Sequence, residues 1–257
     1  MNTPKRYELS DEQWDQLATL FPSYRTGRPS KLSNKTAFNA NLWLLKSSAA
    51  RVIYRNAMCH GRQSTTVFVA ERTRVVFEKA FTAISDDPDM ENISLDSTSI
   101  HVHQKATGAK NVRCIVENQA IGMSRGGRTT KIHAIVDGLG NPLRFLLTGV
   151  HIHDSQAAQP LLVQLELAGV NVIADKAYDA KHLRDYIDTE HGSYTITPKV
   201  SIKEKWDCDY HVYWDRHLIE SLFNEVKNCI RLATRYNKLA HVFLETVYIS
   251  AILVWLK

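Results

Sequence analysis

The residues best suited to chemistry lie between positions 213 and 227, where the chain reads Y-W-D-R-H-L-I-E-S-L-F-N-E-V-K. Four side chains in this stretch recur at spacings of 3, 4 and 7 residues: Tyr213, Arg216, Glu220 and Lys227. A helix would carry all four along one face. That face would hold an aromatic hydroxyl, two cations and a carboxylate beside apolar residues. An ordinary surface helix scatters its charges, so the alignment indicates a functional site.

Two further acids lie where a folded sheet would concentrate charge. Asp96 stands inside a predicted strand at 93–100, and Asp175 follows a short apolar strand at 171–174. A carboxylate inside a sheet is costly unless it is paired or binds a metal. The ligands of open α/β sheets gather at the carboxyl ends of strands. Taken singly, each acid also fits a helix cap, a turn or a surface charge.

Three carboxylates from three elements would repel one another if they met at one point. Divalent metal resolves that conflict, because hard oxygen ligands suit Mg²⁺ and Mn²⁺. Two such ions about 3.5–4 Å apart can activate an attacking oxygen and stabilise the leaving oxygen at a phosphodiester. The candidate catalytic residues and metal ligands are therefore Asp96, Asp175 and Glu220. Asp179, one helical turn after Asp175, is the alternative second acid and otherwise a cap or supporting group.

The surrounding pattern predicts an α/β domain. Strands are expected over 93–100, 129–136, 143–147, 171–174 and 194–196, and helices over 155–168, 180–190 and from 214 onward. Their order, β-β-β-α-β-α-β-α over residues 90–257, is typical of a mixed sheet with flanking helices. A capping box at Ser10–Gln13 and an N-cap at Ser33 each predict a helix start. Residues 1–85 are accordingly expected to form a small all-α domain before the sheet.

A mild basic bias in composition suggests a nucleic-acid partner. The chain has 257 residues, 44% of them apolar, and a net charge of +5. We expect a cytoplasmic protein without a signal peptide or a membrane span, and with reduced cysteines, since no two cysteines are close in sequence. The Arg125-Gly-Gly-Arg128 segment fits either a phosphate contact or a plain hairpin turn. Two stretches concentrate cations: Lys105, Lys110, Arg113, Arg125, Arg128 and Lys131, then Lys227, Arg231, Arg235 and Lys238.

These motifs resemble the DDE transposases of bacterial insertion sequences, and in particular the insertion sequence five family. The four aligned residues of 213–227 match the Tyr-Arg-Glu-Lys signature of that group with its full spacing. Asp175-Lys-Ala-Tyr178-Asp179 resembles the motif around its second acid, and Leu95-Asp96-Ser-Thr98 the segment around its first. Ser124–His133, Gly140–Leu143 and Arg235–Leu239 are also similar to the family.

The resemblance implies an RNase H-like fold with a helix-turn-helix-like domain before it. It implies strand cleavage at the ends of an insertion sequence and transfer of the freed 3′-hydroxyl into target DNA. Asp96, Asp175 and Glu220 would hold two Mg²⁺ ions, for which Mn²⁺ can substitute. The expected DNA-binding residues are Arg216, Lys227, Tyr213, Arg125, Arg128 and Lys131.

The expected partners are the terminal inverted repeats and target DNA, with a homodimer in the DNA complex and association with the bacterial nucleoid. A decayed, non-catalytic copy that still binds DNA is the alternative. A repair or recombination nuclease of the same fold is a third candidate, and the signature spacing argues against it.

One segment departs from the family pattern. Residues 51–68 read R-V-I-Y-R-N-A-M-C-H-G-R-Q-S-T-T-V-F, where the family carries a text like W-R-D-L-P-x-x-Y-G-x-W-x-T-V-Y-x-R-F. Regrouping the allowed codons by one base, from the last base of Arg51, gives R-D-L-P-E-R-Y-x-P-W-Q-T-V-Y-N-R-F, which is close to that text. We hypothesise two compensating frameshifts that bound residues 51–75.

The coding DNA tests this hypothesis directly. We expect the gene, read one base out of register across this segment, to spell the family pattern. Codons that spell unrelated residues in that register would disprove the frameshifts.

Overall fold

The computed structural model describes residues 7–21, 33–47, 76–107, 119–199 and 208–257. These residues divide into two compact units. The first unit combines the chain up to Asp86 with Val226–Ala233 and His241–Lys257, and the second holds Asp87–Glu225 and Thr234–Ala240. The frameshift hypothesis for 51–75 falls outside the described residues, as does much of the segment expected to be helix-turn-helix-like.

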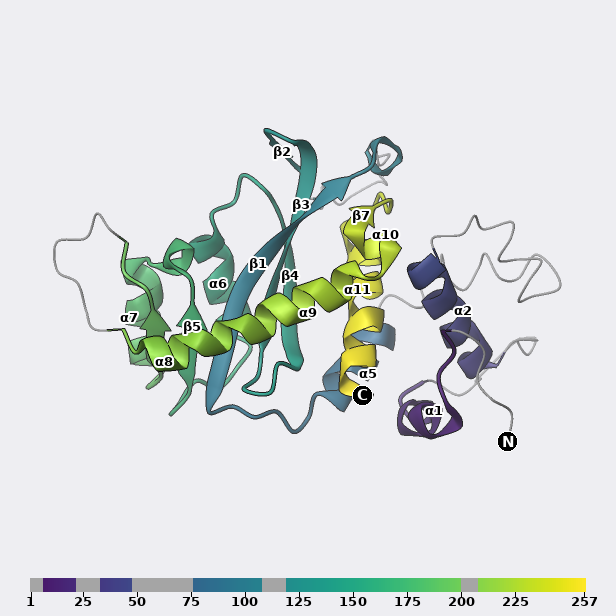
Figure 1. Cartoon of the computed structure of the whole chain (residues 1–257), viewed down its shortest axis with the longest axis horizontal. Helices are drawn as coiled ribbons and strands as arrows, with labels where there is room; N and C mark the ends of the chain where they lie inside the picture. The colour runs from purple at the N-terminus through teal and green to yellow at the C-terminus, as the bar shows by residue number, and fades with distance from the viewer. Residues whose placement is uncertain (1–6, 22–32, 48–75, 108–118, 200–207) are drawn as a thin grey trace, which may run out of the picture. The chain divides into compact units, whose positions relative to one another are not determined.

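A seven-stranded mixed sheet forms the centre of the second unit (Figure 1). Strand β1 runs antiparallel to β3 and parallel to β5 and β7, and β5 runs parallel to β6. On the edge of β3 that faces away from β1, β2 pairs with the first residues of β3 and β4 pairs with the rest. The strands are β1 (Asn92–Val102), β2 (Gly122–Ser124), β3 (Gly127–Val136), β4 (Pro142–Gly149), β5 (Asn171–Ala174), β6 (Ser193–Ile196) and β7 (Thr234–Arg235).

Helices flank this sheet on both faces. Helix α6 contacts β1, β3 and β4, whereas η4 contacts β1 and β5. Successive side chains of a strand point to opposite faces of the sheet. Asp96 bonds to Arg216 of η4, whereas the next residue, Ser97, bonds to Asp154 at the start of α6. The helices η4 and α6 therefore lie on opposite faces of the sheet. The elements are α6 (Asp154–Leu162), α7 (Lys181–Thr189), α8 (Tyr210–Tyr213), α9 (His217–Lys227) and the short helices η2 (Gln104–Ala106), η3 (Lys176–Tyr178) and η4 (Trp214–Arg216).

The predicted fold class is confirmed: the second unit is α/β with a mixed sheet and flanking helices, an arrangement consistent with an RNase H-like fold. Its core includes buried apolar residues on both faces of the sheet: Ile93 and Leu95 of β1 lie on one face and Ile132 of β3 on the other, and all three are fully buried. The strands β2 and β7 were not predicted, because each has three residues or fewer. No described helix is both long and apolar enough to cross a bilayer.

Arg235 is a structural residue of the second unit. It is fully buried, and burial lowers the pKa of its guanidinium to about 10. Its Nη1 donates to the Gln119 carbonyl at 2.8 Å and to Thr130 Oγ1 at 2.7 Å, and its Nε donates to the Asn237 carbonyl at 3.0 Å. These bonds join the turn after β7 to β3. This cation is therefore used inside the protein and is not presented to a nucleic acid.

The first unit is helical. Its members are α1 (Asp11–Ala18), α2 (Asn34–Ser47), α5 (Val76–Ile84), α10 (Ile230–Ala233) and α11 (Ala240–Trp255). The predicted capping box is present, with the Ser10 hydroxyl accepting from Gln13 N at 3.1 Å, and Ser33 Oγ accepts from Thr36 N before α2. An aromatic cluster packs within this unit, with ring centroids 5.4–6.3 Å apart: Trp14, Phe21, Phe38 and Phe77.

Glu245 of α11 is poorly accommodated in this unit. Burial is the main cause, and the charge of Glu78 the second, of a raised pKa of about 7 for the Glu245 carboxyl. Its Oε2 is buried without a hydrogen-bond partner among the described residues. Because its folded pKa exceeds its unfolded value, the folded state favours the protonated form. Glu245 therefore reduces stability progressively as pH rises from about 4.5 to about 7.

We expect Glu245→Gln to remove that loss. Thermal unfolding measured between pH 5 and pH 8 should show the variant gaining stability over the unchanged protein as pH rises, with the largest gain above pH 7. Glu78→Gln is the matched control and should give a smaller gain, since Glu78 is exposed. A gain for Glu245→Gln that does not vary with pH would contradict this assignment.

Candidate active site

The candidate site forms where the sheet has a gap along one edge of β1. Strand β5 pairs with β1 as far as Leu95, opposite Ala174, and β7 pairs with it again only from His101. No described strand occupies that edge between these two pairings. Asp96 is the first residue of β1 beyond the pairing, and Asp175 is the first residue after β5. Because the strands are parallel, the two acids lie next to each other at the mouth of this gap.

The helical segment 210–227 carries the third acid, Glu220, and the arginine that links it to Asp96. The prediction of a helix here is confirmed, with η4 as a short tighter turn between α8 and α9. Arg216 at the end of η4 donates from Nη2 to Asp96 Oδ2 at 2.7 Å and from Nη1 to Glu220 Oε1 at 2.8 Å. One guanidinium therefore joins the acid of β1 to the acid of α9. The buried residues Ile219 and Leu222 anchor this helix.

Burial sets the electrostatics of Asp96. Its side chain is only 15% exposed, and desolvation raises the pKa of its carboxyl. Two contacts oppose that rise: the backbone N–H of Ser97, which donates to Oδ1 at 2.7 Å, and the charge of Arg216. The nearby charge of Asp175 adds to the rise. The ionised form of Asp96 is thus under-compensated, which favours an additional cation at this position.

Asp175 and Asp179 have different environments. The Asp175 carboxylate makes no capping hydrogen bond, and within the described residues it has no hydrogen bond or ion pair. Asp179 is 4% exposed, forms a salt bridge with Arg184 and accepts from Lys199 N at 3.0 Å. The carboxylate of Asp179 is already used to hold the chain together, whereas that of Asp175 is available.

The three acids do not form a closed metal cage. Among the described residues, no group of three His, Cys, Asp or Glu side chains is close enough to hold a metal ion. Arg216 lies between two of the acids instead. Glu220 is 55% exposed, so its carboxylate has room to turn on the helix surface.

The predicted DNA-binding residues lie in several environments. Tyr213 is half-buried at the end of α8, and Lys227 is exposed at the end of α9. Arg125 is exposed on the turn between β2 and β3, and Arg128 is exposed at the start of β3. This turn joins the two strands as a hairpin, which is one of the two structures that the Arg-Gly-Gly-Arg sequence predicts. Gly127 has a φ of 104°, which glycine adopts without strain.

Lys131 has an internal role. Its side chain is only 14% exposed, and its Nζ donates to Asp154 Oδ1 at 2.9 Å and to the Ile152 carbonyl at 3.2 Å. Asp154 also accepts from Ser97 Oγ at 3.0 Å. The ammonium group therefore neutralises a carboxylate on the face of β1 opposite Asp96, rather than pointing to solvent.

Sequence reasoning missed the polar cluster around Asp154. His133 is fully buried, and burial lowers the pKa of its imidazole to about 4; its Nδ1 lies 3.8 Å from Asp154 Oδ1. The Tyr178 hydroxyl is also buried here. Burial first, and then the charges of Asp154 and Asp96, raise the pKa of Tyr178. A signal was present: residues 131 and 133 alternate on a strand, so both point to one face.

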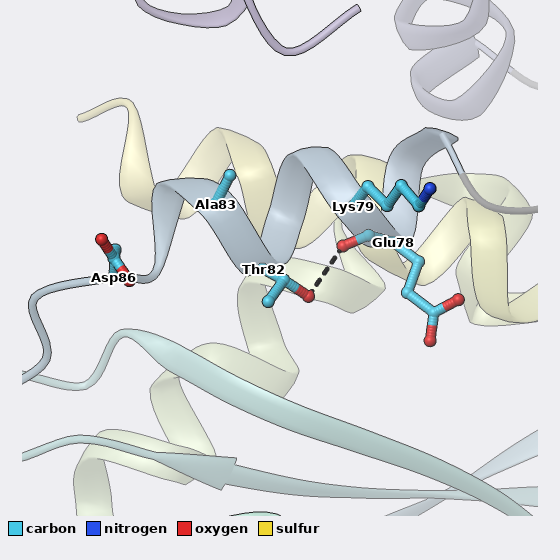
Figure 2. A pocket seen from close by; sticks show the side chains of 5 residues that line it. All are labelled: Glu78, Lys79, Thr82, Ala83 and Asp86. Carbon is cyan, nitrogen blue, oxygen red and sulfur yellow. Dashed lines mark hydrogen bonds between the residues drawn. The ribbon is translucent and has the colours of Figure 1, made fainter.

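A pocket opens elsewhere, along α5 of the helical unit. Figure 2 shows the five residues that line it, all of them exposed: Glu78, Lys79, Thr82, Ala83 and Asp86. The Thr82 hydroxyl bonds back to the Glu78 carbonyl at 3.0 Å, as a threonine of a helix commonly does. This pocket includes none of the three candidate acids.

Comparison with known proteins identifies the family. The family described as transposase DDE domain matches residues 87–255. The chain belongs to this family of DDE transposases. A Brucella ovis protein named as a transposase for insertion sequence element IS6501 is 38% identical over 130 residues, which are 50% of this chain and 99% of that protein.

Two solved transposase structures are also similar to this DDE transposase. A piggyBac transposase synaptic complex with hairpin DNA has 10% identity and a TM-score of 0.47, covering 96% of this chain and 74% of that one. A Mos1 transposase paired-end complex with the left transposon end has 11% identity and a TM-score of 0.29, covering 88% and 87%.

We expect Lys131→Met to destabilise the protein. Removing the ammonium leaves the Asp154 carboxylate uncompensated and largely buried, which costs about 3 kcal/mol of unfolding free energy. Urea denaturation should show this loss, and adding Asp154→Asn should restore part of it, because the unpaired charge disappears.

Arg128→Met is the matched control, since Arg128 is an exposed cation of the same strand. Its cost should stay within about 0.5 kcal/mol. If Lys131→Met left stability unchanged and weakened DNA binding, the internal role would be contradicted and Lys131 would be a DNA-binding residue.

Proposed function

We propose that this transposase cleaves DNA strands at the ends of its insertion sequence in a metal-dependent reaction and transfers the freed 3′-hydroxyl into target DNA. The proposal is supported by two observations: Arg216 bonds to both Asp96 and Glu220, and Asp175 follows the strand that pairs with β1 just before Asp96. These acids come from a strand, a strand end and a helix, and Arg216 contacts two of them. Membership of the DDE transposase family supports the same reaction.

The donor set fits divalent metal. All three candidates are carboxylates, which suit hard cations such as Mg²⁺, with Mn²⁺ as a substitute. The raised pKa of Asp96 reflects a buried negative charge that a further cation would stabilise. A pair of ions held there would activate the attacking oxygen and stabilise the leaving one. Asp175 is favoured over Asp179 as the second acid, because the Asp175 carboxylate makes no capping hydrogen bond whereas the Asp179 carboxylate is bound in a salt bridge with Arg184.

The remaining residues would hold the DNA. Arg216 can grip a phosphate with two parallel N–H donors, and Lys227 supplies a point charge on the same helix. Tyr213 can donate its hydroxyl to a phosphate oxygen. Arg125 and Arg128 extend the contact to the hairpin of β2 and β3, where their exposure suits a backbone contact.

The partners we propose are the terminal inverted repeats and the target DNA, with two copies of the chain in the DNA complex. The site of action would be the bacterial nucleoid. A non-catalytic copy that binds DNA is the second candidate, which the departure at 51–75 favours. It would retain DNA affinity and lose productive cleavage.

Oligonucleotides that carry the element's own ends, incubated with Mg²⁺, test the proposal. We expect wild-type cleavage, and a loss of at least about a hundredfold for Asp96→Ala, Asp175→Asn and Glu220→Gln, because even groups that only support metal ligands cost 10–100-fold. Mobility shift should show that these variants still bind the DNA. Glu166→Gln, an exposed acid, is the matched control and should cleave normally.

Binding without cleavage by the wild-type chain would favour the non-catalytic copy. Full cleavage by Glu220→Gln or Asp96→Ala would remove these acids from the reaction. If Asp179→Asn remained folded and lost cleavage while Asp175→Asn did not, the second acid would be Asp179.

A further inference from the structure

Arg216 holds the oxygens that a metal ion would need. Its Nη2 lies 2.7 Å from Asp96 Oδ2 and its Nη1 lies 2.8 Å from Glu220 Oε1. We propose that Arg216 is a placeholder cation, which joins these two acids when metal is absent and gives way to divalent metal when it binds. This inference rests on the proposed function, because it assumes that the same acids bind metal.

Charge balance supports a temporary occupant. Three carboxylates and one guanidinium leave the gap with a net charge of about −2 when all three acids are ionised. Within the described residues the Asp175 carboxylate has no ion pair or hydrogen bond, although its charge acts on both Asp96 and Arg216. A single arginine thus holds the cluster together without neutralising it, and the remaining negative charge attracts a divalent cation.

The geometry supports release. The Arg216 side chain is 21% exposed, so a path to solvent exists, and Glu220 is 55% exposed on the helix surface. The Nε of Arg216 is buried without a hydrogen-bond partner among the described residues, so the present position does not satisfy the whole guanidinium. A DNA phosphate offers such a group several acceptor oxygens at once.

Competition for the same oxygens links metal binding to DNA binding. While Arg216 holds Asp96 Oδ2 and Glu220 Oε1, metal must displace it, so Arg216 lowers the apparent metal affinity. Metal binding in turn frees the guanidinium for a phosphate. Linkage requires these effects to be reciprocal, so DNA that binds Arg216 should tighten metal binding. Arg216 is in this sense a positioning residue that keeps the acids assembled until metal and DNA arrive.

Manganese binding to the full chain, without DNA, tests the proposal. Protein stripped of metal with a chelator is titrated with Mn²⁺, and free Mn²⁺ is measured by electron paramagnetic resonance. We expect Arg216→Gln to bind Mn²⁺ about tenfold more tightly than the wild type. We also expect its thermal midpoint without metal to fall and to recover when Mn²⁺ is added, because the metal replaces the lost cation.

Two matched variants separate this role from a general effect of charge. Lys181→Gln also removes one positive charge, from an exposed side chain of α7, and should change Mn²⁺ affinity less than twofold. Arg216→Lys keeps the charge but lacks the planar fork that spans two acids. It should tighten Mn²⁺ binding by a smaller factor, and it serves in place of Arg216→Gln if that variant does not fold.

Equal or weaker Mn²⁺ binding by both Arg216 variants would overturn the placeholder role. A separate control tests the site itself: Asp96→Asn and Glu220→Gln should each weaken Mn²⁺ binding. If these two variants bind Mn²⁺ as the wild type does, or if none of the proteins binds it, the proposed metal site fails. A failure of the placeholder role alone would leave their weakened binding intact.

Discussion

Repulsion between carboxylates at one gap in the sheet is the constraint on which the site depends. Asp96 and Asp175 are adjacent because β1 and β5 are parallel and β5 ends at Ala174. The helical segment 210–227 packs beside this point and carries Glu220, which Arg216 links to Asp96. One guanidinium that bonds to two of the acids offsets part of this repulsion. The position of the helical segment 210–227 thus depends on charge as well as on its buried apolar face.

Strand β1 is the central element because its two faces carry different polar groups. On one face Asp96 meets Arg216, and on the other Ser97 meets Asp154 and its partner Lys131. Asp96 and Asp154 are both largely buried, and each is paired with a cation, as burial requires. The Ser97 backbone N–H also donates to Asp96 Oδ1, so neighbouring residues of β1 contribute to both clusters.

The pattern of apolar and polar residues predicted much of the fold. The strand at 171–174 is found with the predicted bounds, and β1, β3, β4, β6 and α7 lie within a few residues of their predicted places. Helix α6 was expected over 155–168 but ends at Leu162. The apolar pattern of the sequence extends past the end of this helix, because Leu167 is also buried although it lies after the helix. Strands β2 and β7 are too short for periodicity to indicate them.

Cations were the hardest residues to place. Arg128 and Lys131 are three residues apart on one strand, yet the first is exposed and the second is paired inside the protein. Arg235 stands in a basic stretch and is fully buried. Charge counts along the chain cannot distinguish these cases, because the difference depends on which carbonyl or carboxylate the fold brings alongside.

The sequence by itself determined the α/β class, the helical segment of 213–227 and the candidate acids, since periodicity and spacing are local properties. Tertiary structure decided the rest. Pairing of β1 with β5 made Asp96 and Asp175 neighbours, and the committed carboxylate of Asp179 set it apart from Asp175. Packing of the helix on the sheet brought Arg216 between Asp96 and Glu220, across 120 residues of chain. Such contacts depend on strand register and on long-range packing, which no local pattern encodes.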